Sequence, residues 1–330
     1  MLGFQAGHYP LADGESVLDC LLRHQQPVPY SCKAGLCQSC LVQAVDCQPP
    51  ALATRGLKAT LQSSGHAMAC QWHPDSDVCV RLPDNQALSV QGHIVGLQQL
   101  NAVVMKLVVQ AEDPTALAEC HPGQYLNLVN SAGTIRSYSV ANDCRQHGRA
   151  EFHIAATAQG LFSHWLFNAA SLGDVLQMRG PAGSCFYVAD ADQQQPLLLV
   201  GVGTGLAPLY AIVNDALAQG HQGPILLVHG ASSTASLYYR AELRALAASH
   251  SKFSYSALVR AGAADADCQQ GDAAESALAL LAALSVAQTR VYLCGNAAFV
   301  HNLRKLVFMR GVRSANIFCD PFVERATQSN

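Results

Sequence analysis

The nine residues CKAGLCQSC (32–40) hold three cysteines, separated by four residues and then by two. A fourth cysteine, Cys70 in AMACQ, follows after a further 29 residues. This order, C-x4-C-x2-C with one distant cysteine, is the spacing of plant-type [2Fe–2S] clusters, because three thiolates must reach one small cluster from a tight loop. Gly35 gives the loop conformational freedom at its middle. The pattern predicts four cluster ligands: Cys32, Cys37, Cys40 and Cys70.

Other uses of the cysteines fit less well. A structural zinc site favours two C-x2-C pairs, and only Cys37 and Cys40 form one. His73 lies three positions after Cys70, as in half of a Rieske site, but that site needs a Cys/His pair upstream, and CKAGLCQSC has no histidine. We expect eight of the remaining cysteines to be packing residues: Cys20, Cys47, Cys79, Cys120, Cys144, Cys185, Cys268 and Cys319.

Composition restricts the class of protein. A chain of 330 residues suits two or three domains, and 50% hydrophobic residues allow each a core. A formal net charge of −3 leaves no basic stripe for a phosphate backbone, so we expect no nucleic-acid partner. The chain has thirteen cysteines, an odd number, and its N-terminal residues do not have the pattern of a signal peptide. We therefore expect a protein of the reducing cytoplasm and not a secreted disulfide framework.

One uncharged stretch raises the question of a membrane span. No charged residue lies between Asp192 and Asp215, close to the ~20 residues that a spanning helix requires. Three glycines and Pro208 interrupt the stretch, as expected where a strand turns into a helix. We therefore predict a buried strand followed by a helix, and no membrane span.

The hydrophobic pattern divides the chain into regions 1–88, 89–190 and 191–330. The first is rich in cysteines and loops. The second has short alternating runs that predict antiparallel strands in a small barrel, at 103–110, 125–130, 136–141, 150–156 and 174–180. The third alternates helical stretches with five apolar strands, which predicts a parallel sheet covered on both faces: PLLLVG, ILLVHG, FSYSALV, RVYLCG and ANIFC.

Two stretches suggest nucleotide chemistry. RSYSVAN (136–142) offers Arg136 to a pyrophosphate, the Tyr138 ring to an isoalloxazine and the Ser139 hydroxyl to its N5. GVGTGLAPL (201–209) follows an apolar strand, and its glycines let the backbone approach a pyrophosphate at a helix N-terminus. Each signal is weak alone, because the first also fits a half-exposed strand and the second lacks the standard G-x-x-G ending.

Taken in order, these stretches resemble the NAD(P)H-dependent reductase components of multicomponent oxygenases. In that family a plant-type ferredoxin domain is fused to a module like ferredoxin–NADP reductase. The resemblance covers nearly the whole chain, through these motifs: PYSCKAGLCQSC with MACQ, RSYS, FHIAATAQGLFSHWLF, GPAGSCF, GVGTGLAP and VYLCGN. Two departures are that Gln38 stands where the family has glycine and that little sequence precedes HYPLADGES for the first strand.

The resemblance implies three domains. These are a β-grasp ferredoxin domain at 1–88, an antiparallel β-barrel FAD domain at 89–190 and a five-stranded parallel α/β NAD(P)-binding domain at 191–330. It implies that electrons pass from NAD(P)H through FAD to the cluster, and then to an oxygenase component or another redox protein. We favour NADH, because the second strand of the third domain is followed by neither an acidic ribose partner nor an arginine clamp.

The resemblance also implies the site residues. Those expected at FAD are Arg136, Tyr138, Ser139, Val140, His153, Gly160, Leu161 and Ser163. Those expected at the nicotinamide nucleotide are Gly201, Gly203, Thr204, Gly205, Pro208, Cys294 and Gly295. Asp320 and Phe322 are expected to return toward the flavin, with a solvated tail as the alternative. Ser139 and Cys294 are the expected catalytic residues, with Cys294 beside the nicotinamide C4.

Two other functions stay open at this point. One is a stand-alone reductase of free flavin, a soluble cytochrome or a sugar-pathway enzyme. The other is a redox-sensing module with slow turnover. In each case we expect a cytoplasmic protein that is a monomer on its own. The identity of the acceptor depends on the surface around residues 32–40.

Overall fold

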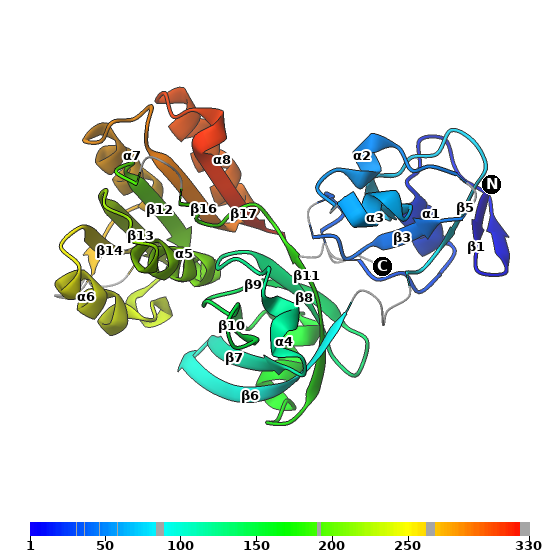
Figure 1. The fold of residues 1–330 in the computed structure, drawn as a ribbon, viewed down its shortest axis with the longest axis horizontal. Coiled ribbons are helices and arrows are strands. Elements are labelled where there is room, and N and C mark those ends of the chain that lie inside the picture. The colour runs from blue at the N-terminus through cyan, green and yellow to red at the C-terminus, as the bar shows by residue number, and fades with distance from the viewer. Residues whose placement is uncertain are drawn as a thin grey trace.

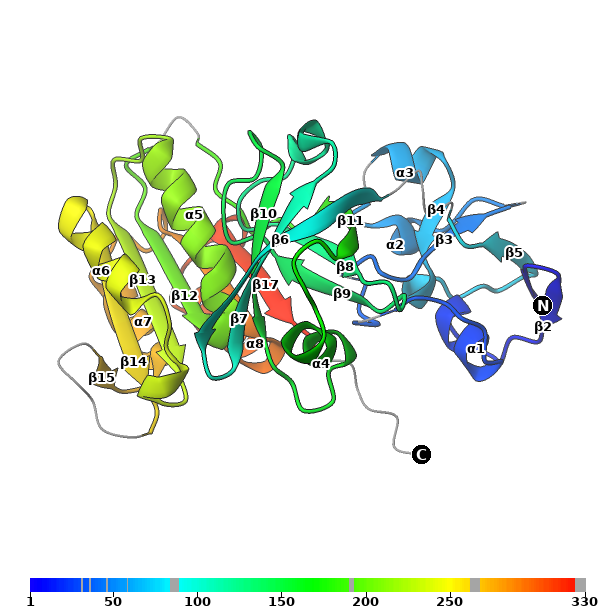
Figure 2. The ribbon, with the colours of Figure 1, turned by 90° about the horizontal axis from the view of Figure 1, so that it is seen from below.

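The computed structural model describes residues 1–30, 32–35, 37–45, 47–57, 59–83, 89–189, 193–261 and 268–323. Its strands form three sheets that follow one another along the chain (Figure 1). In the view of Figure 2, the middle sheet lies between the other two. The predicted domain boundaries at 88/89 and 190/191 fall in or beside segments outside the described residues, so they stay predictions.

The N-terminal sheet is a small mixed sheet with the strand order β2-β1-β5-β3-β4. β1 pairs with β5 in parallel, and the other pairs are antiparallel. Helix α1 packs on the same core as the sheet, which is the predicted β-grasp arrangement. The elements are β1 (Leu2–Phe4), β2 (Gly7–Tyr9), α1 (Val17–Arg23), β3 (Leu41–Ala44), α2 (Ala51–Thr54), α3 (Ala59–Ser63), β4 (His66–Met68), η1 (Ala69–Gln71) and β5 (Val78–Arg81).

The middle sheet is antiparallel, with the strand order β10-β7-β6-β11-β8-β9. A bridge between Val140 and Phe152 joins its two edges, so the sheet closes into the predicted barrel. Phe162 and Leu166 of helix α4 belong to its core. The elements are β6 (Val90–Asn101), β7 (Val104–Ala111), η2 (Pro114–Leu117), β8 (Tyr125–Val129), β9 (Ile135–Ser139), β10 (Arg149–Ala155), α4 (Leu161–Asn168) and β11 (Val175–Ala182).

The C-terminal sheet is parallel throughout, with the strand order β15-β14-β13-β12-β16-β17. The five predicted strands are present, and the two-residue β15 extends them. The elements are β12 (Leu197–Val202), η3 (Gly203–Gly205), α5 (Leu206–Ala218), β13 (Ile225–Ala231), η4 (Thr234–Ser236), α6 (Arg240–Ser249), β14 (Phe253–Val259), β15 (Gln269–Gln270), α7 (Ala273–Ala282), β16 (Arg290–Asn296), α8 (Ala297–Met309), η5 (Ser314–Asn316) and β17 (Ile317–Phe322).

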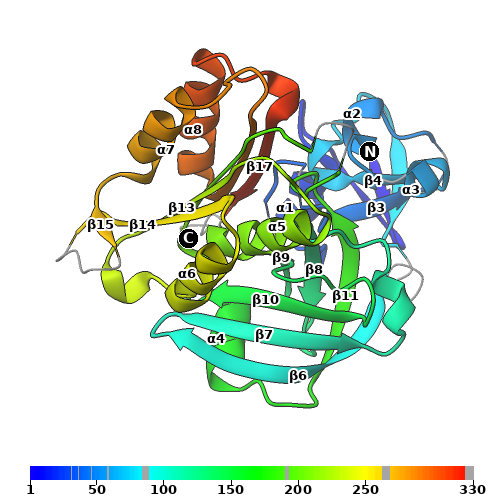
Figure 3. The same cartoon turned by 60° about the vertical axis from the view of Figure 1, so that its left-hand side comes forward.

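Helices cover both faces of this parallel sheet (Figure 3). α5 and α6 pack on one face, and α7 and α8 pack on the other. The uncharged stretch before Asp215 forms β12 and most of α5, as predicted, and none of the described helices is long and apolar enough to cross a bilayer. The strand order reverses between β12 and β16, so a ligand crevice is expected at the carboxyl ends of these strands.

Candidate functional site

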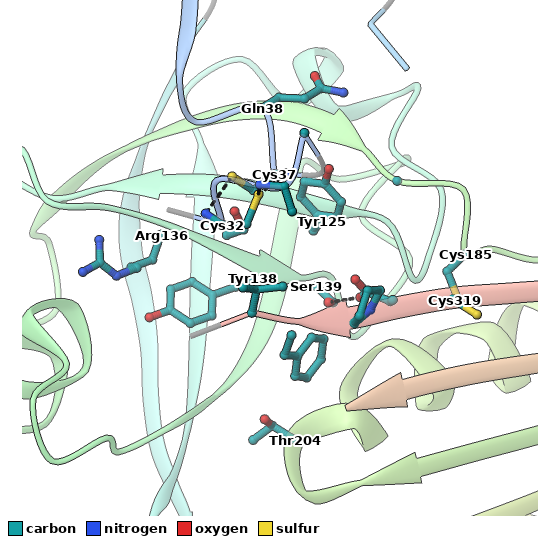
Figure 4. A pocket seen from close by; sticks show the side chains of 18 of the residues that line it. Cys32, Cys37, Gln38, Tyr125, Arg136, Tyr138, Ser139, Cys185, Thr204 and Cys319 are labelled. Carbon is teal, nitrogen blue, oxygen red and sulfur yellow. Dashed lines mark hydrogen bonds between the residues drawn. The ribbon is translucent and has the colours of Figure 1, made fainter. Parts of the chain in front are cut away.

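A cavity of about 1450 Å³ lies where the three sheets meet, and it has walls from all of them. The cysteine loop, strand β9 and the turn after β12 line it, together with the last strand, β17. Single small-ligand sites usually occupy ~300–1,000 Å³, so this cavity has room for more than one ligand group. In Figure 4, Tyr138 and Ser139 lie between the Cys32–Cys37 loop and Thr204.

The cysteine loop turns its backbone amides toward sulfur. The N–H groups of Ala34 and Cys37 donate to Cys32 Sγ, with donor–acceptor distances of 3.3 and 3.4 Å. The Cys32 N–H donates to Cys37 Sγ at 3.5 Å. Gly35 has a φ of +71°, and a Cβ there would lie 2.6 Å from Gln71 Cγ, so the turn requires glycine at this position.

The four predicted ligands form two thiol pairs. A hydrogen bond between Cys40 and Cys70 raises the pKa of the Cys40 thiol and lowers the pKa of the Cys70 thiol to about 7. A hydrogen bond between Cys32 and Cys37 raises the pKa of the Cys37 thiol. A [2Fe–2S] cluster has two irons with two cysteines each, so two pairs suit it. Among the described residues, no group of three or more His, Cys, Asp or Glu could hold a single metal ion. This donor set, thiols with inward-facing N–H groups, fits the cluster.

Gln38 occupies a left-handed position in this loop. Its φ is +55°, a conformation that costs a residue with a Cβ roughly 1–2 kcal/mol and costs glycine little. Its side-chain Nε2 donates to the Gly56 carbonyl at 3.0 Å. The backbone geometry therefore favours glycine at this position, and the side-chain hydrogen bond of Gln38 offsets part of the strain.

Asn127 connects the cysteine loop to the barrel. It is a β8 residue, only 4% exposed, and its Nδ2 donates to the Cys37 carbonyl at 2.9 Å. Its Oδ1 accepts from Ser137 Oγ at 2.6 Å and from Ser39 Oγ at 3.3 Å. One buried amide thus joins the cluster loop to β9, the strand that carries RSYS.

The predicted flavin residues on β9 face the cavity. Arg136, Tyr138 and Ser139 line it, and the Tyr138 ring lies 5.2 Å from the Phe162 ring, centroid to centroid. Ser139 Oγ donates to Asp320 Oδ2 at 2.6 Å. Burial raises the pKa of Asp320 to about 6, although the Ser139 hydrogen bond opposes this shift. An aromatic ring, a hydroxyl and a carboxyl with a raised pKa therefore share one wall.

Two other predicted flavin residues differ in position. Val140 is fully buried in the barrel core and is not among the residues that line the cavity. His153 lines the cavity, but its ring nitrogens contact Glu151 Oε1 at 2.9 Å and the Tyr238 hydroxyl at 3.2 Å. Burial lowers the pKa of His153, although Glu151 opposes the shift. The His153 ring therefore ties the barrel to the loop before α6.

The start of helix α4 suits a diphosphate. Gly160 is its N-cap, no side chain caps it, and a Cβ on Gly160 would overlap Thr157 Oγ1 and Ser163 Oγ. These two hydroxyls lie 3.0 Å apart and line the cavity with Leu161. The first turn of α4 thus has no side-chain cap and lies beside two hydroxyls that line the cavity, which fits the phosphates of FAD.

The glycine-rich turn serves both packing and access. Gly203 has a φ of +57° and open space where a Cβ would stand, whereas a Cβ on Gly205 would overlap the Cys294 carbonyl. Thr204 is the residue of the predicted set in this turn that lines the cavity. Gly201, Pro208 and Gly295 do not line the cavity. A Cβ on Gly201 would lie within 3 Å of Leu209, and a Cβ on Gly295 would lie within 3 Å of Val202, so both glycines permit close packing. Pro208 is buried in α5.

Cys294 lies behind the cavity wall. It is 0% exposed, its Sγ is 3.7 Å from Cys185 Sγ, and burial raises its pKa. Cys185 and Cys319 line the cavity instead, although the sequence suggested only a packing role for them. Cys47 is exposed, so the expectation that it packs in a core is wrong.

The C-terminal strand completes the site. β17 pairs with β16 so that Asp320 lies opposite Cys294 and Phe322 opposite Asn296. Asp320 and Phe322 both line the cavity, as a flavin contact requires and a solvated tail would not. Three further residues contact the cysteine loop or line the cavity and were not predicted from the sequence: Asn127, Tyr125 and Arg304. A polar residue inside the apolar run YLNLVN was the available signal for Asn127.

Three domain families match the chain in the predicted order. They are a 2Fe-2S iron-sulfur cluster binding domain at residues 6–75, an oxidoreductase FAD-binding domain at 91–187 and an oxidoreductase NAD-binding domain at 199–305. The matched regions agree with the three sheets and with the three groups of site residues.

Curated relatives and solved structures extend the match over nearly the whole chain. The reductase component of the naphthalene 1,2-dioxygenase/salicylate 5-hydroxylase systems of Ralstonia sp is 29% identical, covering 96% of this chain and 95% of that protein. The reductase subunit of an Amycolatopsis aromatic O-demethylase is 32% identical, covering 73% and 75%. The structure of the Amycolatopsis cytochrome P450 reductase GcoB matches with a TM-score of 0.68 and 26% identity, covering 97% and 98%.

Proposed function

Because this chain belongs to the family of NAD(P)H-dependent reductase components of oxygenase systems, we propose that its electron acceptor is the oxygenase component of such a system. The protein is an electron-transfer oxidoreductase with FAD, NAD(P)H and [2Fe–2S] as its cofactors. When bound, FAD accepts a two-electron hydride from NAD(P)H, and the cluster carries single electrons onward. The observation that carries the proposal is that the cysteine loop, β9 and β17 line one cavity.

Each wall of the cavity has its own function in this scheme. Arg136 and the first turn of α4 hold the diphosphate, and Tyr138 packs on the ring system. Ser139 Oγ, hydrogen-bonded to Asp320 Oδ2, is positioned to hold a proton near the reacting ring. Cys294 is kept as a nicotinamide contact because its strand partner, Asp320, lines the cavity. The four paired thiols ligate the cluster.

NADH is the proposed donor. The hydroxyls of Ser232 and Ser233 each lie 3.1 Å from Ser236 Oγ at the end of β13, where a nucleotide ribose would bind. Arg260, after β14, pairs with Asp272 at 3.2 Å, so this cation is already matched by a carboxylate. A 2′-phosphate needs an uncommitted cation at this edge, and a 2′-hydroxyl does not. A higher kcat/KM for NADPH than for NADH would contradict this assignment.

The proposal also covers the domain boundaries, the cellular compartment and the oligomeric state. We propose that the domains divide at 88/89 and 190/191, that the protein works in the cytoplasm and that it is a monomer on its own. Thirteen cysteines, with no disulfide between described ones, are compatible with a reducing compartment.

The decisive experiment pairs the purified protein with a purified oxygenase component. NADH should reduce the oxygenase anaerobically, and a preparation with about two irons per FAD should be active. Cys70→Ser should abolish this reduction and keep NADH–ferricyanide activity, because ferricyanide can take electrons from the flavin. Cys47→Ser, which changes an exposed cysteine outside the cluster, is the matched control. Rapid reduction of free flavin with none of the oxygenase would favour a stand-alone reductase instead.

A further inference from the structure

Helix α8 presents an unusually basic outer face. From residue 276 to residue 319 the sequence contains five Lys or Arg and no Asp or Glu, in a chain whose formal net charge is −3. Four of these cations lie on α8 or just after it and are exposed: Arg304, Lys305, Arg310 and Arg313. Positive charge is therefore concentrated on one part of an otherwise acidic protein.

These cations are combined with exposed apolar side chains. Phe308 is 58% exposed and Met309 is 70% exposed, and they follow Arg304 and Lys305 by one helical turn, so each cation shares a helix face with an apolar residue. None of the ion pairs between described residues involves any of the four cations. Exposed apolar groups surrounded by charge are typical of surfaces that bind another protein.

The outer face of α8 adjoins the large cavity that the cysteine loop lines. Its residues border a hollow of about 390 Å³, and Arg304 and Ile317 line both this hollow and the large cavity. Across the large cavity, the wall on the cluster side includes Gln38, Leu52 and Arg55. Leu52 is 56% exposed, and Figures 1 and 3 show α2 and α8 on the same side of the molecule.

We propose that this surface docks an acidic face of the electron-accepting protein, with the acceptor's redox centre over the cluster loop. The acceptor face consists of Leu52, Arg55, Arg304, Lys305, Phe308 and Met309. The inference rests on the proposed function, since it concerns the partner that receives the electrons. Leu52, Phe308 and Met309 supply an apolar centre, and the cations supply a rim that selects negative charge.

The positive charge of this surface should raise the rate at which an acidic acceptor binds. Opposite charges raise the rate of encounter between two proteins, and the effect falls steeply as salt rises. An acidic acceptor is therefore guided to the side of the protein where Arg304 borders the cavity that the cysteine loop also lines. A basic acceptor gains nothing from this surface.

The test uses two protein acceptors of opposite charge with the FAD- and cluster-loaded protein. The acidic probe is a plant-type ferredoxin and the basic probe is cytochrome c. The variant is Lys305→Glu/Phe308→Ala, which changes two residues of the acceptor face outside the large cavity. The matched control is Lys252→Glu/Leu172→Ala, which changes an exposed lysine and an exposed leucine elsewhere.

The first readout needs no electron transfer. Carbodiimide joins lysines to carboxylates at contact distance, so we expect ferredoxin cross-links at Lys305 in the wild type and the control. High salt should remove these cross-links. Cross-links confined to lysines away from α8 would overturn the proposal.

The second readout is kinetic. The variant should raise KM for ferredoxin about tenfold at low salt with kcat nearly unchanged, and the control should match the wild type. Cytochrome c reduction should be equal or faster in the variant. Equal KM in variant and wild type, or reduction of cytochrome c but not ferredoxin, would overturn the acceptor face. If neither protein is reduced while ferricyanide is, the proposed electron output itself fails, which is a different result.

Discussion

The side-chain amide of Asn127 donates a 2.9 Å hydrogen bond to the backbone carbonyl of Cys37, so a barrel strand holds the loop that carries three of the predicted cluster cysteines. The same side chain accepts from Ser137, which lies between Arg136 and Tyr138 on β9. One buried amide therefore fixes the cysteine loop relative to β9, the strand that carries the predicted flavin residues.

Replacing that amide should loosen the loop. Asn127→Leu leaves the Cys37 carbonyl and the Ser137 hydroxyl without their partner, which should cost about 1–3 kcal/mol of unfolding free energy. We also expect faster hydrogen exchange at residues 37–40 and slower reduction of the cluster, with NADH–ferricyanide activity retained. Asn168→Leu, on an exposed helix position, is the control. Unchanged exchange in the loop would contradict this role for Asn127.

Gln38 offers a test of backbone strain. Both Gln38→Gly and Gln38→Ala remove the hydrogen bond to the Gly56 carbonyl, but only glycine also relieves the positive φ of +55°. The glycine variant should therefore be more stable than the alanine variant by about 1 kcal/mol. Denaturant unfolding of the two variants measures this difference. Equal stabilities would mean that the loop relaxes to another backbone conformation.

Asp320 should make stability depend on pH. Burial raises its folded-state pKa to about 6, above the value of about 3.9 in an unfolded chain, so the folded state binds this proton more tightly. Stability from this group is complete below pH 4 and is lost as pH rises through 6. Asp320→Asn should remove this loss and be more stable than wild type above pH 6, by up to about 3 kcal/mol.

Unfolding free energies between pH 4 and pH 8 check this prediction. The wild-type curve should fall relative to the Asp320→Asn curve between pH 4 and pH 6. Asp13→Asn, at an exposed position, is the control and should follow the wild type. Parallel wild-type and Asp320→Asn curves would show that Asp320 is not buried as a charged group.

Gly160 tests the diphosphate cradle. A Cβ there would overlap the hydroxyls of Thr157 and Ser163, so Gly160→Ala should displace both and weaken FAD binding by about tenfold, or ~1.4 kcal/mol. Fluorescence titration of the flavin-free protein with FAD measures the change. Gly271→Ala is the control, because a Cβ there meets only Leu258 at an ordinary 3.6 Å. Equal FAD affinity in the two variants would place the diphosphate elsewhere.

Patterns with a fixed period or spacing could be predicted from the sequence. The strands β12, β13 and β16 lie inside the parallel sheet and are buried on both faces, so their sequences are nearly continuous apolar runs. The strands β14 and β17 lie nearer the sheet edges and are partly exposed, but their apolar residues were enough to predict them. Strand β6 was missed because register shifts at Ile94/Gly96 and Gln99/Asn101 interrupt its alternation. The cysteine spacing located the loop, but its left-handed turns depend on backbone geometry.

Contacts between distant segments could not be predicted. Asn127 reads as a polar residue in a half-buried strand until the Cys37 carbonyl is placed against it, 90 residues away along the chain. Cys294 was predicted at the nicotinamide from its motif, but its burial on an interior strand and its contact with Cys185, 109 residues away along the chain, are known only from the fold. The basic run on α8 is visible in the sequence, but only the fold places its Arg304 on the cavity that the cysteine loop also lines.

The position of β17 has a consequence for biosynthesis. This strand is translated after every other described strand, and it supplies Asp320 to Ser139 and Phe322 to the cavity. The N-terminal sheet and the barrel leave the ribosome earlier, so a nascent chain has its cysteine loop and RSYS strand before this last wall exists. The electron path is therefore complete only after β17 has been made, and a chain truncated before Ile317 would lack this wall of the cavity.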